Sequence, residues 1–191
     1  VYKMTVSYGQ VLWDDGSNVY LKDEQGRLSS VIYARDNLIG IADDRGYNYE
    51  TGILNAIDRL ASVIFNRVNE LHGTGYGLDN STGNDFFSLI DAGKGVIASN
   101  IKISDVILQD LSKIAASTVM DSPGDGSNAL NIARINREFL IDGSFTIGDY
   151  WNNQTDSLGI VSQRANWLFE NQNTLVDAIE KERESVSGVS I

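Results

Sequence analysis

Apolar side chains recur at alternating steps of three and four residues through the last quarter of the chain. This spacing places them on one side of a helix, in the heptad pattern of helices that pack lengthwise against other helices. The seam consists of Leu158, Val161, Ala165, Leu168, Gln172, Leu175, Ile179, Glu182 and Val186. The pattern predicts one helix that begins near Ile147, with about 40 residues and a length of about 60 Å. A helix of this length is typical of rod-like assembly subunits and is not needed by a globular enzyme of this size.

A second amphipathic helix is predicted between residues 50 and 71. Its apolar stripe consists of Ile53, Ile57, Leu60, Ile64, Val68 and Leu71, widened by Leu54, Ala61 and Phe65. Asn69 and Glu70 are expected to close the helix, before glycines at positions 73, 75 and 77. This stripe is the natural partner of the C-terminal seam. Gln172 interrupts the seam and either fixes the register of packing or reaches solvent at a frayed edge.

The first 46 residues alternate apolar and polar positions between turn signals. Residues 2–8 and 11–13 are predicted as strands around a turn at Gly9-Gln10, and Asp15-Gly16-Ser17-Asn18 is a second strong turn before a strand at 19–22. Residues 28–35 fit either a short helix or a further strand.

The segment from 73 to 128 is rich in Gly, Asn, Asp and Ser. Short extended pieces are expected at Phe86-Phe87 and Val96-Ile97, a weak helix over 106–116, and a loop over 121–126. A helix should follow, with Ser127 as its N-cap and with a buried side made of Leu130, Ile132, Ala133 and Ile135. Thr146 and Asp149 fit a capping box for the long helix, and Gly188 marks its end.

These patterns predict an α+β chain, in which long axial helices form a rod-like helical bundle beside a smaller β-rich domain. We divide it into a β-rich segment of an outer domain (1–46), an axial helix (47–73), a mixed region of loops, short strands and short helices (74–145), and the long heptad helix (146–191).

Composition and charge exclude several classes of function. The formal net charge is −11, from 15 Lys and Arg against 26 Asp and Glu, which argues against binding to nucleic acid or to an anionic membrane surface. Without cysteine, the chain has no disulfide, thiolate metal site or thiol nucleophile. We find no apolar run of transmembrane length and no signal peptide at the start, and the chain reads as a fragment excised from a longer protein.

Candidate chemistry is sparse, and we predict no catalytic, cofactor or metal site. His72 is the only histidine, and we interpret it as a cap or packing residue rather than a member of a Ser-His-Asp triad. Residues 79–85 superficially resemble a calcium loop, but Ile90 stands where a bidentate Glu belongs, so a polar Asx-type turn is the better interpretation. Residues 124–128 are a weak candidate for anion binding, because they lack a Lys and contain Asp125.

Several segments, taken in order, resemble the flagellar hook-associated proteins, and most of all the hook–filament junction family. Residues 71–79 followed by 83–87 are similar to the segment that closes the central helix of this family, and 113–117 followed by 124–130 resemble its next recurring stretch. Residues 145–150, Leu158-Gly159 and 183–190 continue the resemblance, and 27–37 resemble the lead-in to the central helix.

The resemblance implies a structural rather than an enzymatic role. Such proteins are exported through the flagellar type III apparatus without a cleavable signal peptide and form a ring between hook and filament. The implied partners are other copies, the hook protein, the second junction protein and an export chaperone, and the implied location is the extracellular flagellum. Two alternatives stay open: another flagellar axial protein such as flagellin, and an extracellular carbohydrate-acting enzyme or binding module that uses acidic residues.

Overall fold

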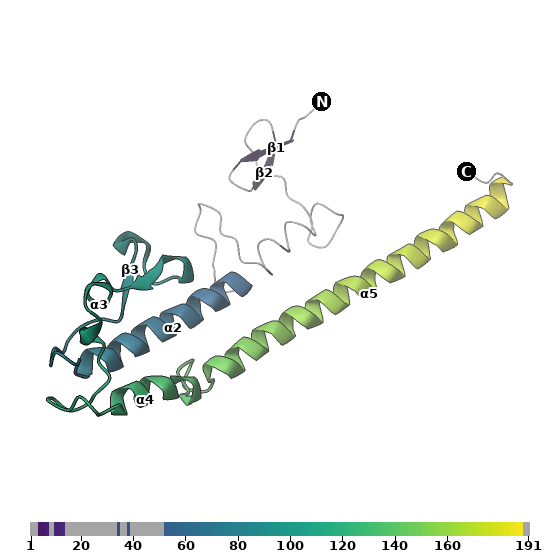
Figure 1. Cartoon of the computed structure of the whole chain (residues 1–191). Coiled ribbons are helices and arrows are strands. Elements are labelled where there is room, and N and C mark those ends of the chain that lie inside the picture. Colours follow the sequence, from purple (N-terminus) through teal and green to yellow (C-terminus); the bar gives the residue numbers. More distant parts are fainter. Residues whose placement is uncertain (1–3, 8–9, 14–33, 35–37, 39–51, 189–191) are drawn as a thin grey trace. The chain divides into compact units, whose positions relative to one another are not determined.

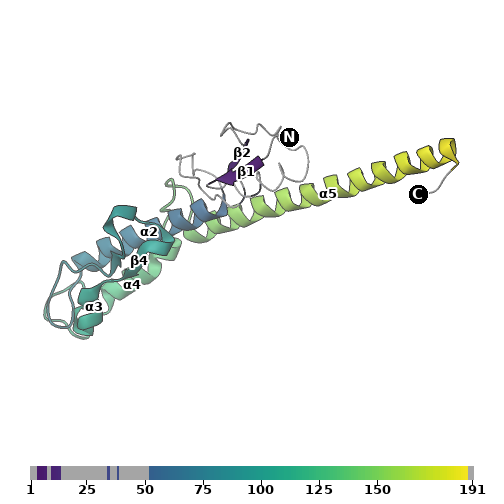
Figure 2. The same cartoon turned by 90° about the horizontal axis from the view of Figure 1, so that it is seen from above.

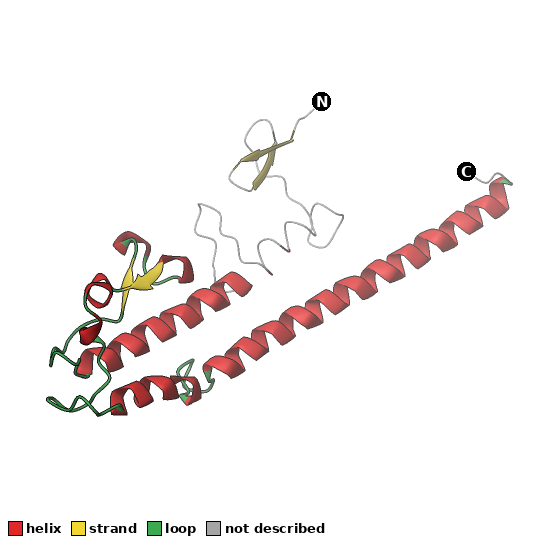
Figure 3. Cartoon of the chain, in the orientation of Figure 1, coloured by secondary structure: helices red, strands yellow, loops and turns green. Residues whose placement is uncertain are grey.

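The computed structural model describes residues 4–7, 10–13, 34, 38 and 52–188, which fall into two units. The first unit is Val1–Tyr150 and the second is Trp151–Ile191. Helices account for most of the described residues, together with two antiparallel sheets of two strands each (Figure 3). This confirms in part the predicted fold class, because the long helix and a small sheet are present. The rod-like bundle and the separate β-rich domain remain predictions.

The N-terminal hairpin pairs β1 (Met4–Ser7) with β2 (Gln10–Trp13). Their register joins Met4 to Trp13 and Ser7 to Gln10. Both predicted strands are therefore confirmed, although Gln10 belongs to the second strand rather than to the turn. The predicted turn at 15–18, the strand at 19–22 and the undecided segment 28–35 lie outside the described residues, apart from position 34.

Helix α2 (Ile53–Thr74) is the centre of the first unit. It contacts α4 (Ser127–Ala133) and η5 (Arg134–Arg137) as well as β3 (Phe87–Leu89) and η3 (Ala98–Asn100). Figure 1 shows β3 on one side of α2 and α4 on the other. The helix ends three residues later than predicted, since α2 continues past Leu71 and through Gly73 to Thr74. Asn69 instead holds the strand, donating from its side chain to the Phe87 carbonyl (2.9 Å) and accepting from the Phe87 N–H (2.8 Å).

The strand β4 (Ile101–Ile103) pairs antiparallel with β3, with Phe87 opposite Ile103. The extended piece predicted at Val96-Ile97 was wrong, because these residues connect η2 (Ala92–Lys94) to η3, and the strand begins four residues later. The buried Asn100 decides this placement. Its amide donates to the carbonyls of Asp91 and Gly95, and its side-chain oxygen accepts from the Asp91 N–H, which closes the loop before β4.

The weak helix predicted over 106–116 is two short helices, α3 (Asp105–Gln109) and η4 (Leu111–Lys113). Extended backbone at Asp110 separates them. In α4, Gly126 rather than Ser127 occupies the N-cap position, and Ser127 is the first helical residue. The predicted buried side of α4 was wrong at Leu130 and Ala133, which are exposed, and correct at Ile135, which is buried.

The long helix α5 (Ile147–Ser187) has 41 residues and begins where the pattern predicts (Figure 2). The Asp149 N–H donates to Thr146 Oγ1 (3.1 Å), and the Thr146 hydroxyl donates to the Asp149 carboxylate (2.7 Å), as in an N-terminal cap. At the other end Gly188 has a φ of 65° and its N–H donates to the Glu184 carbonyl (2.8 Å). This is the left-handed C-cap for which glycine is suited, so both predicted ends are confirmed.

Candidate assembly interface

The predicted apolar stripe of α2 is only partly covered within the described structure. Val68 is buried, together with Ala56 on the same helix. The other stripe residues are half-buried, namely Ile53, Ile57, Leu60, Ile64 and Leu71, and the neighbouring Leu54 is exposed. The helix thus buries one face in its own unit and keeps apolar surface beyond it.

The seam of α5 is more open to solvent. Leu175 and Ile179 are each 63% exposed, and Val186 is 85% exposed. The side chains of Leu158 and Leu168 are exposed to a smaller extent. Gln172 is exposed, and Val161 is half-buried. Large apolar side chains off the seam are exposed as well: Ile160, Trp167, Phe169 and Val176. Apolar surface on more than one side of a single helix indicates more than one packing partner.

A polar cluster at the end of α2 joins it to two distant segments. His72 is 1% exposed, and its Nε2 accepts the Ala115 N–H at 2.9 Å. Because Nε2 is an acceptor, the proton lies on Nδ1, which donates to the Asn84 carbonyl at 2.7 Å. Both ring nitrogens are therefore bonded to the backbone and neither can act as a catalytic base. The interpretation of His72 as a packing residue is confirmed.

Asn128 completes this cluster and was missed in the sequence. It is 1% exposed, and its amide donates to the carbonyls of Leu71 (3.0 Å) and Ala115 (2.7 Å). It thereby gives the Leu71 carbonyl, near the end of α2, a second donor beside the Thr74 hydroxyl (3.0 Å). An asparagine in the first turn of a helix is ordinarily read as a cap or a turn residue, so only its tertiary contacts reveal this role.

The segment that resembles a calcium loop is an Asx turn, as predicted. Asp79 Oδ1 accepts from the N–H (3.0 Å) and the hydroxyl (2.6 Å) of Ser81, and Asp79 Oδ2 pairs with Lys113 Nζ at 2.8 Å. These bonds from Lys113 and Ser81 hold the pKa of Asp79 well below its usual range. In the part of the chain that the structure describes, no three metal-binding side chains form a cluster.

Asp125 occupies the start of α4 and leaves it unsuited to an anion. Its carboxylate accepts from the hydroxyls of Ser127 and Ser117 (2.7 Å each) and from the backbone N–H groups of Thr118 and Ser127 (3.0 Å each). These bonds hold the pKa of Asp125 far below normal, and the Ser112 hydroxyl and N–H similarly lower the pKa of Asp110. A general acid needs a raised pKa, so these carboxylates act as fixed acceptors instead.

Two arginines on α2 hold the segment that leads into α5. Arg67 donates from Nε to Glu138 Oε2 (2.8 Å) and from Nη2 to Glu138 Oε1 (3.3 Å), a bidentate pair, and from Nη1 to Glu70. Arg59 pairs with Asp142 and lies 5.6 Å from the centre of the Tyr150 ring. Tyr150 is in the first turn of α5, so these contacts connect that turn to α2.

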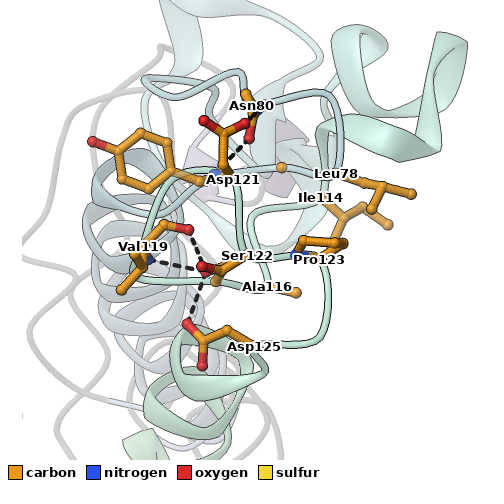
Figure 4. Close-up of a pocket in the computed structure, with 12 residues that line it drawn as sticks. Leu78, Asn80, Ile114, Ala116, Val119, Asp121, Ser122, Pro123 and Asp125 are labelled. Carbon is orange, nitrogen blue, oxygen red and sulfur yellow. Dashed lines mark hydrogen bonds between the residues drawn. The ribbon is translucent and has the colours of Figure 1, made fainter.

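A pocket of about 390 Å³ opens between the loops 76–80, 114–119 and 121–125. Leu78, Ile114 and Pro123 gather on one side of it, while Asn80 and Asp121 lie above and Asp125 below (Figure 4). The rim carries exposed apolar side chains, since Leu78 is 68% and Val119 is 56% exposed.

The chain is similar to flagellar hook-associated protein 1 of Bacillus subtilis (strain 168), with 27% identity over 217 aligned positions. The match covers 97% of this chain and 42% of the relative. The resemblance inferred from the ordered motifs is thereby confirmed. This chain is a distant relative of that protein.

The chain spans about two fifths of the length of the curated relative it matches. No family model matches the chain. Among the helices that the structure describes, none is both long and apolar enough to cross a membrane.

Proposed function

We propose that this chain is part of a structural subunit of the bacterial flagellum, one that joins hook to filament and has no catalytic activity. The observation that carries the proposal is the similarity to a flagellar hook-associated protein along nearly the whole chain. A similarity that extends over both α2 and α5 concerns the helical framework rather than one local motif.

The exposed seam of α5 supports an assembly role on physical grounds. About seven aliphatic side chains along such a seam, buried at ~25 cal/mol per Å², supply on the order of 10 kcal/mol before ordering entropy is subtracted. Apolar surface of this extent, left in water along one helix, marks a site where partners pack in the working state. In the proposed assembly these partners are helices of the same subunit and of its neighbours.

The proposal assigns packing roles to the residues predicted from the sequence. Val68 already packs inside the first unit, and the half-buried stripe of α2 keeps surface for a further helix. The seam of α5 has seven aliphatic residues, namely Leu158, Val161, Ala165, Leu168, Leu175, Ile179 and Val186. Gln172, exposed in the middle of the seam, sets the register because its amide tolerates burial only opposite a hydrogen-bonding partner.

The proposed partners are other copies of the protein, the hook protein and the second junction protein, with an export chaperone before assembly. The proposed location is the extracellular flagellum, reached through the flagellar type III apparatus. No cofactor is needed for such a role.

Immunogold electron microscopy of isolated flagella tests the proposal, with antibody raised against this chain. We expect one gold cluster at each hook–filament boundary, and none in a strain that lacks the gene. Labelling along the whole filament would move the assignment to a flagellin-type subunit. A flagellum without label, in cells that produce the protein, would rule out the assembly role.

A further inference from the structure

The pocket near the end of α2, which we name the Leu78 pocket after its most exposed apolar residue, has the properties of a contact surface. Its apolar rim is formed by Leu78, Ile114 and Val119, all exposed. Exposed apolar groups around a hollow are typical of protein interaction sites. A volume of about 390 Å³ lies at the lower end of the range for ligand pockets and admits an aromatic side chain with its neighbours.

The walls of the Leu78 pocket are fixed before any partner arrives. Tyr76 and Ser117 form a backbone bridge, with N–H to carbonyl distances of 2.8 and 3.3 Å. Asn80 binds Asp121 twice, through its amide to the carboxylate and through its side-chain oxygen to the Asp121 N–H. A preformed surface loses little conformational entropy on binding, which favours affinity.

The charge of the pocket indicates what it accepts. Asp121 and Asp125 line it, and none of its lining residues in the described part of the chain is a Lys or Arg. Asp125 is saturated by four hydrogen bonds, whereas the Asp121 carboxylate accepts from the Asn80 amide and is exposed. A suitable occupant therefore combines an apolar side chain with a nearby cation.

The same unit presents such a surface elsewhere, at residues 134–139. Phe139 is 63% exposed, and Arg134 and Arg137, which precede it in the sequence, are exposed as well. Within the described residues neither arginine forms an ion pair with a carboxylate. The adjacent Glu138 pairs with Arg67 instead. We name these three residues the Phe139 knob. Close to it in the sequence, Ile135 and Ile141 are buried, at 5% and 1% exposed.

We propose that the Phe139 knob of one copy docks into the Leu78 pocket of a second copy, with Arg137 or Arg134 facing Asp121. This inference rests on the proposed function, because it supplies a contact between neighbouring subunits. Pocket and knob are different surfaces, so the contact is heterologous: each copy can bind one neighbour through its pocket and another through its knob. Such contacts build rings or helical arrays rather than closed dimers.

The absence of cysteine allows a direct test by site-specific cross-linking. The full chain is prepared as Leu78→Cys and, separately, as Phe139→Cys, and the two are mixed at high concentration with a short bismaleimide. We expect a cross-linked heterodimer well above the products of either variant alone. Thr155→Cys, at an exposed site on α5, replaces Phe139→Cys in the matched control.

The charge contribution is tested in the same assay. Arg137→Glu in the Phe139→Cys chain is expected to lower the cross-linked yield by about tenfold, while Arg164→Glu, on α5, leaves it unchanged. Asp121→Asn in the Leu78→Cys chain is expected to lower it less, since the amide keeps the bond to Asn80. Circular dichroism verifies that each variant is folded.

Three results would overturn the proposal: equal yields for the Phe139 and Thr155 positions, a dominant Leu78-to-Leu78 product, or no cross-link at all. The assay is independent of the test of function. Gold label at the hook–filament boundary without the cross-link removes the docking inference and leaves the proposed function. The cross-link without flagellar label removes the proposed function and leaves the contact between copies.

Discussion

At the scale of single residues, the end of α2 is held by polar side chains that are fully buried. His72 and Asn128 together bond to backbone groups of Leu71, Asn84 and Ala115, so both ring nitrogens of His72 and the amide nitrogen of Asn128 have partners. Unpaired, such groups would cost about 1–3 kcal/mol each. Glycines are needed nearby because the backbone there passes so close to neighbouring atoms that a Cβ would not fit.

Gly77 and Gly73 respond oppositely to alanine. A Cβ at Gly77 would lie 2.5 Å from the Ser112 carbonyl oxygen and 3.0 Å from Lys113 Cα, so Gly77→Ala is expected to destabilise the fold by roughly 1–3 kcal/mol. At Gly73, inside α2, nothing lies within 4 Å, and alanine is expected to stabilise the helix by up to about 1 kcal/mol. Urea unfolding followed by circular dichroism measures both. Equal effects would mean that the close approach at Gly77 is absent.

The bonds to Asp125 predict a loss of stability in acid. Since its pKa is lowered in the folded chain, the carboxylate stabilises the fold above the unfolded pKa of about 4, and this contribution disappears as the pH falls below that value. Asp79 adds to the effect in the same direction.

Urea midpoints measured between neutral pH and pH 3 are therefore expected to fall on the acid side. Asp125→Asn should lower the midpoint at neutral pH and make the acid decline shallower, whereas Asp156→Asn, on α5, should change neither. An Asp125→Asn chain with the full acid decline would contradict the assignment.

At the scale of elements, the connection between α2 and the start of α5 depends on charged side chains. Arg67 and Glu138 have side chains about one-third exposed or less, at 27% and 32%, while Arg59 and Asp142 are more open. A partly buried bidentate pair contributes more than an exposed one, because water screens it less. The bonds of Glu138 to Arg67 also raise the pKa of Arg67, so the pair stays charged in the folded chain.

Arg67→Gln is expected to destabilise the first unit by about 1 kcal/mol, and Arg59→Gln by only a few tenths. A double-mutant cycle with Glu138→Gln isolates the pair energy from other effects of each substitution. Chemical unfolding gives the four free energies needed. A coupling energy near zero would show that the ion pair between Arg67 and Glu138 does not contribute to the free energy of unfolding.

At the scale of the whole molecule, α5 keeps large apolar side chains exposed to water along its seam. Leu168, Leu175 and Ile179 contribute to a seam that stays exposed, so replacing one of them should hardly change the stability of the fold. Replacement by a charged residue should weaken any assembly that covers the seam, because the assembly would then bury that charge.

Leu175→Asp in the full-length protein tests this separation. We expect an unchanged unfolding midpoint for the chain, but few filaments and little motility in cells that carry the variant as their only copy. Asn173→Asp adds the same charge two residues away, off the seam, and should leave both normal. Normal filaments with Leu175→Asp would exclude the seam from assembly.

The sequence by itself determined what depends on neighbouring residues. The start of α5 after Thr146, its end at Gly188, the Asx turn at Asp79 and the stripe of α2 all follow from helical periodicity or from short-range hydrogen bonds. The similarity to flagellar proteins was likewise visible in the order of local motifs. These signals need no knowledge of which distant segments meet.

Only the tertiary structure decided which polar groups are buried and which apolar groups are not. Asn69 bonds to the backbone of Phe87, and Asn100 closes the loop before β4. Asn128 is buried, whereas Leu130, which was predicted to be buried, is exposed. An asparagine has the same turn-forming preference wherever it lies in the sequence, and its burial depends on carbonyl and N–H groups supplied by distant residues. The pocket at Leu78 arises in the same way, from three loops whose contacts with one another leave apolar side chains at the surface.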